Sequence, residues 1–135
     1  MFDRILFPLD RSLETSHAIS LVADLALKYN CETIVLSVID PSDMNAEALA
    51  QLREQRQQLL QQAQDALRKA GLSAVKAMTT EGKVAFAICD VADDENANLI
   101  VMGCRGLGLA EDEESTNSVS MRVMQLSPCP VLMVP

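Results

Sequence analysis

The sequence predicts an α/β fold in which helices cover both faces of a parallel β-sheet. Short runs rich in Val, Ile and Leu alternate five times with longer segments whose apolar residues recur at helical spacing. The runs are apolar at nearly every position, which is typical of strands buried on both faces. Strands that alternate with helices form parallel sheets with right-handed crossovers. A chain of 135 residues is most simply one domain, spanning residues 1–135.

The elements follow one another along the chain, with polar or glycine-containing turns between them. Ser12 is a candidate N-cap for the first helix, Asn30 suits its exit, and Gly71 stands where a helix-ending glycine belongs. A final helix is expected to follow Ser118. The predicted strands span 4–9, 33–39, 74–78, 99–102 and 131–134, and the other predicted helices span 12–29, 46–70 and 84–95.

The composition excludes several classes of function. The net charge of −8 opposes binding to nucleic acid phosphates and to anionic membranes. With no Trp and three Phe, the chain has no aromatic platform for single-stranded nucleic acid. No apolar run approaches the roughly 20 residues of a membrane span, and the first residues lack the basic region of a signal peptide. These observations predict a cytoplasmic protein with no nucleic acid or membrane partner.

The four cysteines, at positions 31, 89, 104 and 129, are widely and irregularly spaced. Without a secretory signal, such thiols are expected to stay reduced. Zinc requires clustered Cys or His ligands, and His17 is the single histidine of the sequence. The sequence therefore predicts no metal site, and it offers no nucleophile and base that would identify catalytic residues.

A tight glycine turn follows the fourth predicted strand. Residues 103–106 read Gly-Cys-Arg-Gly, and the hydroxyl-rich segment 117–120 comes after an acidic loop. A strand, a glycine turn and a helix N-terminus are parts from which a phosphate cradle is built. Ligands of parallel sheets bind outside the carboxyl ends of the strands, where Asp10 and residues 38–40 also belong. Asp40 is expected either to bond a ribose hydroxyl or to cap the turn at 41–43.

Four segments spread over the whole chain resemble the universal stress protein family. Residues 4–12 (RILFPLDRS) are similar to its first strand and turn, and residues 38–40 (VID) to the end of its second strand. Residues 99–106 (LIVMGCRG) are close to its most specific motif, and residues 127–134 (SPCPVLMV) are typical of its ending. The resemblance implies a Rossmann-like, five-stranded parallel sheet in the order 3-2-1-4-5.

The resemblance also implies an adenine nucleotide, ATP or AMP, as the ligand. Asp10 and Val38 would contact adenine or its ribose, and the hydroxyl-rich segment would hold phosphates through backbone N–H and hydroxyl groups. Arg105 is a further candidate, because arginine matches phosphate oxygens bidentately. The residues expected to form the site are Pro8, Leu9, Asp10, Val38, Met102, Gly103, Arg105, Gly106, Asn117, Ser118, Val119 and Ser120.

Two features depart from the ATP-binding pattern of the family. Ten residues rather than nine separate Gly106 from Asn117, and Asn117 stands where the pattern has Gly. Asn tolerates a positive φ better than other non-glycine residues, so the turn can persist. The four acids at 111–114 leave three alternatives open: a solvated loop that points away, weakened nucleotide binding, or a Mg²⁺ ion that bridges acid and phosphate of ATP.

The last predicted strand, 131–134, would lie at a sheet edge in the order implied by the resemblance. Its residues are Val, Leu, Met and Val, with no charge to prevent pairing with another chain. We therefore expect a two-fold homodimer through 131–134, which is also the habit of the family.

Three functions follow, in decreasing order of support. The first is a homodimeric regulatory protein of the stress response that binds an adenine nucleotide. The second is an interaction module of the same fold that has lost ATP, favoured by Asn117 and the acidic loop. The third is a slow ATPase or an autophosphorylating protein that uses Ser118 or Ser120, for which the sequence offers no general base or metal cluster.

Overall fold

The computed structural model describes residues 1–9, 15–103 and 113–135, with the backbone alone for residues 15, 16 and 113–118. Five parallel strands form one sheet in the order β3-β2-β1-β4-β5. This arrangement confirms the predicted fold class and strand order. The strands are β1 (Arg4–Pro8), β2 (Glu32–Ile39), β3 (Val75–Glu81), β4 (Leu99–Gly103) and β5 (Val131–Val134).

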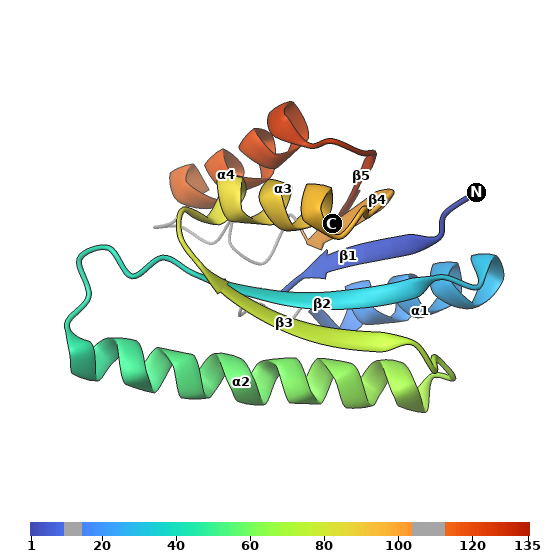
Figure 1. The fold of residues 1–135 in the computed structure, drawn as a ribbon, viewed down its shortest axis with the longest axis horizontal. Coiled ribbons are helices and arrows are strands. Elements are labelled where there is room, and N and C mark those ends of the chain that lie inside the picture. Colours follow the sequence, from blue (N-terminus) through green and yellow to red (C-terminus); the bar gives the residue numbers. More distant parts are fainter. Residues whose placement is uncertain (10–14, 104–112) are drawn as a thin grey trace.

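The helices lie in two layers on either side of the sheet (Figure 1). α1 (Thr15–Tyr29) and α2 (Ala46–Lys69) cover the face that holds Phe7 and Val35. α3 (Val84–Asp94) and α4 (Glu113–Leu126) cover the face that holds Leu6 and Met102. Because successive side chains of a strand point to opposite faces, each inner strand contributes to both aliphatic clusters.

The predicted turn residues end the first two helices. Asn30 follows α1 with a φ of 55°, and Gly71 follows the C-cap of α2 with a φ of 111°. At the start of α2, the side-chain oxygen of Asn45 accepts a hydrogen bond from the backbone N–H of Ala48 at 2.7 Å. The predicted cap at Ser12 lies outside the described residues.

The third strand is longer than its sequence predicts. It runs to Glu81 rather than to Met78, and it pairs with β2 in register from Thr33–Val75 to Ile39–Glu81. Because Thr79 and Thr80 are polar, the apolar pattern of the sequence does not predict that the strand continues past Met78. They are tolerated because β3 is an edge strand, whose side chains are only partly covered.

The final helix begins earlier than the sequence predicts. α4 starts at Glu113 and not after Ser118, so Asn117 lies within a helix and not in a turn of positive φ. The physical reason lies in the acids that were expected to form a loop. Glu113 and Glu114 occupy the first turn of α4, where negative charge is stabilised by the positive end of the helix dipole.

The described cysteines are free thiols in this structure. Cys31 and Cys89 are buried and Cys129 is half-buried. Burial raises the pKa of all three thiols, so each stays protonated at neutral pH. Cys104 lies outside the described residues. None of the helices in the described part of the chain has both the length and the apolarity needed to cross a bilayer.

Candidate functional site

The carboxyl edge of the sheet is stepped at its centre. β1 ends at Pro8, level with Leu36 of β2, whereas β2 continues to Ile39. At about 3.3 Å per residue, the end of β2 stands roughly 7–10 Å beyond the end of β1. In Figure 1, β2 and β3 run on past the point where β1 ends. The strand order reverses between β1 and β4, which is where sheets of this kind bind ligands.

Several predicted site residues lie near the strand ends around this step. Val38 lies in the part of β2 that extends beyond β1, and Met102 lies near the end of β4. Both side chains belong to the cluster beneath α3 and α4, with exposed fractions of 6% and 7%. Pro8 and Gly103, both half-buried, are the last residues of β1 and β4. On the side of α3 and α4, the step is therefore bordered by a wall of apolar side chains that are almost wholly buried.

Leu9 continues the line of β1 into the step. Its side chain is buried in the other cluster, beneath α1 and α2. Its backbone N–H donates a hydrogen bond to the carbonyl oxygen of Leu36 at 2.8 Å. The end of β1 is thus held against β2 by main-chain bonding and by packing on the helix layer.

The remaining predicted residues are placed less completely. Asp10, Arg105 and Gly106 lie outside the described residues, and of Asn117 and Ser118 the structure describes the backbone alone. Val119 packs against the same cluster as Met102, and Ser120 is 7% exposed.

The position of α4 changes what its amides can do. The free N–H groups of a helix belong to its first turn, and that turn begins at Glu113. The N–H groups of Ser118, Val119 and Ser120 lie further along α4, where helical hydrogen bonding occupies them. In this conformation the anion-binding end of α4 is not at the hydroxyl-rich segment.

Asp40 closes the turn after β2. Its carboxylate accepts hydrogen bonds from the hydroxyl and the backbone N–H of Ser42, the latter at 3.0 Å. These bonds lower the pKa of Asp40 below its usual value. Asp40 therefore caps the turn at 41–43, as one of its two predicted roles requires.

Arg56 reaches the carboxyl edge and was not among the predicted site residues. Its Nη1 donates a hydrogen bond to the carbonyl oxygen of Leu9 at 3.4 Å. The sequence carried a signal for it, because Arg56 is in helical register with the buried residues Leu60, Ala63 and Leu67 of α2. A charged residue on a buried stripe requires polar partners, and the Leu9 carbonyl at the end of β1 is one of them.

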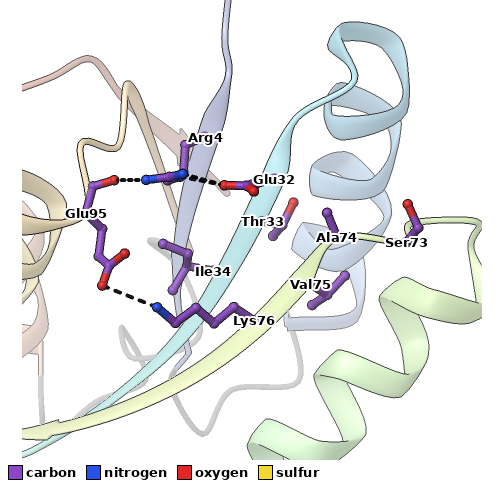
Figure 2. A pocket seen from close by; sticks show the side chains of 9 residues that line it. All are labelled: Arg4, Glu32, Thr33, Ile34, Ser73, Ala74, Val75, Lys76 and Glu95. Atoms are coloured by element: carbon purple, nitrogen blue, oxygen red, sulfur yellow. Dashed lines mark hydrogen bonds and ion pairs between the residues drawn. The ribbon is translucent and has the colours of Figure 1, made fainter.

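A hollow of about 400 Å³ lies at the opposite, amino-terminal edge of the sheet. Figure 2 shows Arg4 between Glu32 of β2 and the main-chain carbonyl of Glu95, and Lys76 beside the Glu95 carboxylate. The N–O distances are 2.6 Å for Arg4–Glu32 and 3.5 Å for Lys76–Glu95. Both cations of this wall have carboxylate partners, and Arg4 also meets the carbonyl end of α3, where positive charge is stabilising. These contacts join β1 to β2 and join both β1 and β3 to the C-terminal end of α3.

A third ion pair lies beside a hollow between β3 and α2. The Nε of Arg53 is 2.6 Å from the Glu81 carboxylate, and the hydrogen bond between them lowers the pKa of Glu81. Among the residues whose side chains the structure describes, no group of three His, Cys, Asp or Glu is arranged to hold a metal ion.

A doubly wound parallel sheet with an apolar step at its strand-order reversal defines a class of α/β proteins whose candidate ligand site is the carboxyl edge. Within that class, the universal stress protein family model matches residues 1–135, and the chain belongs to this family. It is 49% identical over 138 residues to universal stress protein Sll1654 of Synechocystis sp., covering 100% of this chain and 87% of that relative. It is also 31% identical over 140 residues to a universal stress protein of Thermus aquaticus, with 99% of each chain covered.

Solved structures share the fold over nearly the whole chain. The hypothetical protein MJ0577 is 28% identical with a TM-score of 0.85, over 99% of this chain and 96% of that one. A universal stress protein in complex with cAMP is 22% identical with a TM-score of 0.81, over 99% and 97% of the two chains. One from Archaeoglobus fulgidus in complex with dAMP is 18% identical with a TM-score of 0.71, over 99% and 98%. At 22% and 18% identity, the similarity to the cAMP and dAMP complexes shows a shared fold alone.

Proposed function

We propose that this chain binds an adenine nucleotide, ATP or AMP, at the stepped carboxyl edge and acts as a homodimeric regulatory protein in the stress response. It would do so as a single domain in the cytoplasm. The observation that carries the proposal is the apolar step at the strand-order reversal, with Val38 and Met102 on its wall. A flat, largely apolar base suits such a wall. Family membership supports the proposal, as do the proteins of this fold that hold cAMP and dAMP.

The nucleoside end of the ligand would lie against β1 and β2. Asp10 and Val38 would contact adenine or its ribose, and Pro8, Leu9 and Met102 would bound the base. Pro8, Val38 and Met102 belong to the ends of three adjacent strands, so their mutual placement needs no movement of a helix. This end of the site has the stronger structural support.

The phosphate end would lie toward β4 and α4. Gly103, Gly106 and Arg105 would follow the phosphates, and the amides and hydroxyls of residues 117–120 would hold them. That contact requires the first turns of α4 to open, because the helix begins at Glu113. Mg²⁺ would enter with ATP, held chiefly by its phosphate oxygens.

A second function is favoured by the same helix. If α4 keeps its first turn, the helix begins with the acidic residues Glu113 and Glu114, and negative charge at a helix N-terminus competes with phosphate for that end. The chain would then be an interaction module of the family that binds no nucleotide. The two functions differ in a single observable, which is whether adenine nucleotides stabilise the fold.

Thermal unfolding with and without nucleotide separates the two functions. A ligand at one hundred times its Kd adds about 2.7 kcal/mol to the free energy of unfolding, which raises the Tm of a chain of this size by roughly 10 °C. We expect such a shift with AMP or with ATP and Mg²⁺, and none with GTP as the matched control. Unchanged melting with AMP, ADP, ATP and cAMP would support the interaction module instead.

A further inference from the structure

α2 directs the charged side chain of Arg56 to the carboxyl end of β1. Arg56 is half-buried, its Nε is enclosed, and its stripe on α2 continues through Leu60, Ala63 and Leu67. Burying part of a guanidinium costs free energy unless its environment compensates, so the packing of α2 specifies where this group lies. The Nη1 contact with the Leu9 carbonyl shows that it lies at the end of β1.

The backbone of Leu9 is held on both sides. Its N–H donates to the carbonyl of Leu36 at 2.8 Å, and its carbonyl accepts from Arg56 at 3.4 Å. That carbonyl belongs to the peptide bond that joins Leu9 to Asp10. A peptide group is planar, so a bond that fixes the direction of the carbonyl also fixes the plane from which the chain continues.

We infer that Arg56 is a positioning residue for the nucleoside end of the site. It holds the Leu9 carbonyl at the end of β1, directly before Asp10, the residue proposed to contact adenine or ribose, and this role rests on the proposed function. Arg56 acts from the layer of α1 and α2, whereas the phosphate contacts would come from α4 on the other face. Its removal should therefore weaken the binding of a nucleoside and of its phosphate esters by the same factor.

Arg53 provides a matched control on the same helix. It lies one turn before Arg56, carries the same charge, and pairs with Glu81 of β3 at 2.6 Å. Its side chain is 54% exposed, and its hydrogen bond goes to β3 and not to β1. Replacing each arginine with methionine removes the same charge and donors from α2, but only the change at position 56 removes the contact with Leu9.

The test is a calorimetric titration of the whole chain with adenosine and with AMP. We expect Arg56→Met to weaken both affinities by roughly tenfold, as the loss of one hydrogen bond to a charged donor would. Arg53→Met should stay within about twofold of the unsubstituted chain, and Arg56→Lys, which keeps a cationic donor, within about threefold. Equal affinities in the two methionine variants would overturn the inference. So would a loss confined to AMP, which marks a phosphate contact, or a lysine variant as weak as the methionine variant.

An unsubstituted chain that binds neither compound contradicts the proposed function, and a ligand-free measurement then decides the role of Arg56. Hydrogen exchange at the amides of Leu9 and Asp10 should be at least about threefold faster in Arg56→Met than in Arg53→Met. Equal exchange in the two variants would show that Arg56 does not hold this peptide.

Discussion

Charged side chains fasten the two ends of the sheet by different means. At the amino-terminal edge, Arg4 joins β1 to Glu32 of β2 and to the carbonyl of Glu95 at the end of α3 (Figure 2). At the carboxyl edge, Asp40 closes a turn and Arg56 contacts the carbonyl of Leu9. The first set joins elements whose packing is already fixed, and the second lies where the chain leaves the sheet toward the candidate site.

The contacts of Arg4 predict a measurable stability effect. Arg4→Met removes hydrogen bonds from a charged donor to two elements, and we expect the free energy of unfolding to fall by about 1–2 kcal/mol. Lys76→Met is the matched control, because Lys76 is 60% exposed and its pair is longer, at 3.5 Å. That variant should change stability by less than about 0.5 kcal/mol. Urea denaturation compares the two, and equal losses would show that Arg4 has no special role at this edge.

At the scale of elements, the sequence predicted those with a clear apolar pattern. β2 is buried along nearly its whole length, and the stripe of α2 sits above the sheet. The end of β3 and the start of α4 were predicted wrongly because their residues are polar. In β3 the register with β2 outweighs the weak strand preference of the residues, and in α4 the acids favour the helix end. Neither effect is visible in the periodicity of one segment.

The end of α2 gives a prediction about a single glycine. Gly71 has a φ of 111°, a region that side chains rarely adopt, although a Cβ there would meet Leu27 only at ordinary contact distance, 3.7 Å. The cost of Gly71→Ala is therefore backbone strain, and we expect a loss of about 1–2 kcal/mol. The exposed Ser73→Ala, two residues on, should stay within about 0.5 kcal/mol. Thermal or urea unfolding measures both, and a neutral Gly71→Ala would contradict the need for glycine here.

At the scale of the whole molecule, strand order brought together residues that are distant in sequence. The sequence placed Val38 and Met102 at strand ends, and the order β3-β2-β1-β4-β5 sets them on one wall. The step itself could not be predicted, because it depends on how far β2 extends beyond β1 in the register of the sheet. The contact of Arg56 with β1 was missed because it is made to a main-chain carbonyl, which leaves no motif in the sequence.

β5 forms one edge of the sheet, as predicted, and its first three residues are half-buried. The exposed apolar side chains of α4, the helix that leads into β5, include Met121 and Met124, each 52% exposed. We propose that this edge pairs with a second copy of the chain, since an uncharged edge strand offers free main-chain bonding.

Light scattering coupled to size exclusion tests this homodimer. The chain should have twice its mass of 14.7 kDa, and Leu132→Lys should give a monomer or an aggregate because a charge then blocks the edge. Leu27→Lys is the control, on an exposed position of α1 away from β5. A Leu132→Lys variant that keeps the dimer mass would contradict pairing through this strand.

The central claim is that an adenine nucleotide binds at the carboxyl edge of the sheet, and amide chemical-shift mapping during a titration with AMP tests it most directly. The account predicts that the largest shifts fall on Leu9, Val38 and Gly103, around the step. The amides around the amino-terminal hollow, such as Thr33, Ala74 and Glu95, should be unchanged. Shifts gathered at that hollow, or no shifts at saturating AMP, would contradict it.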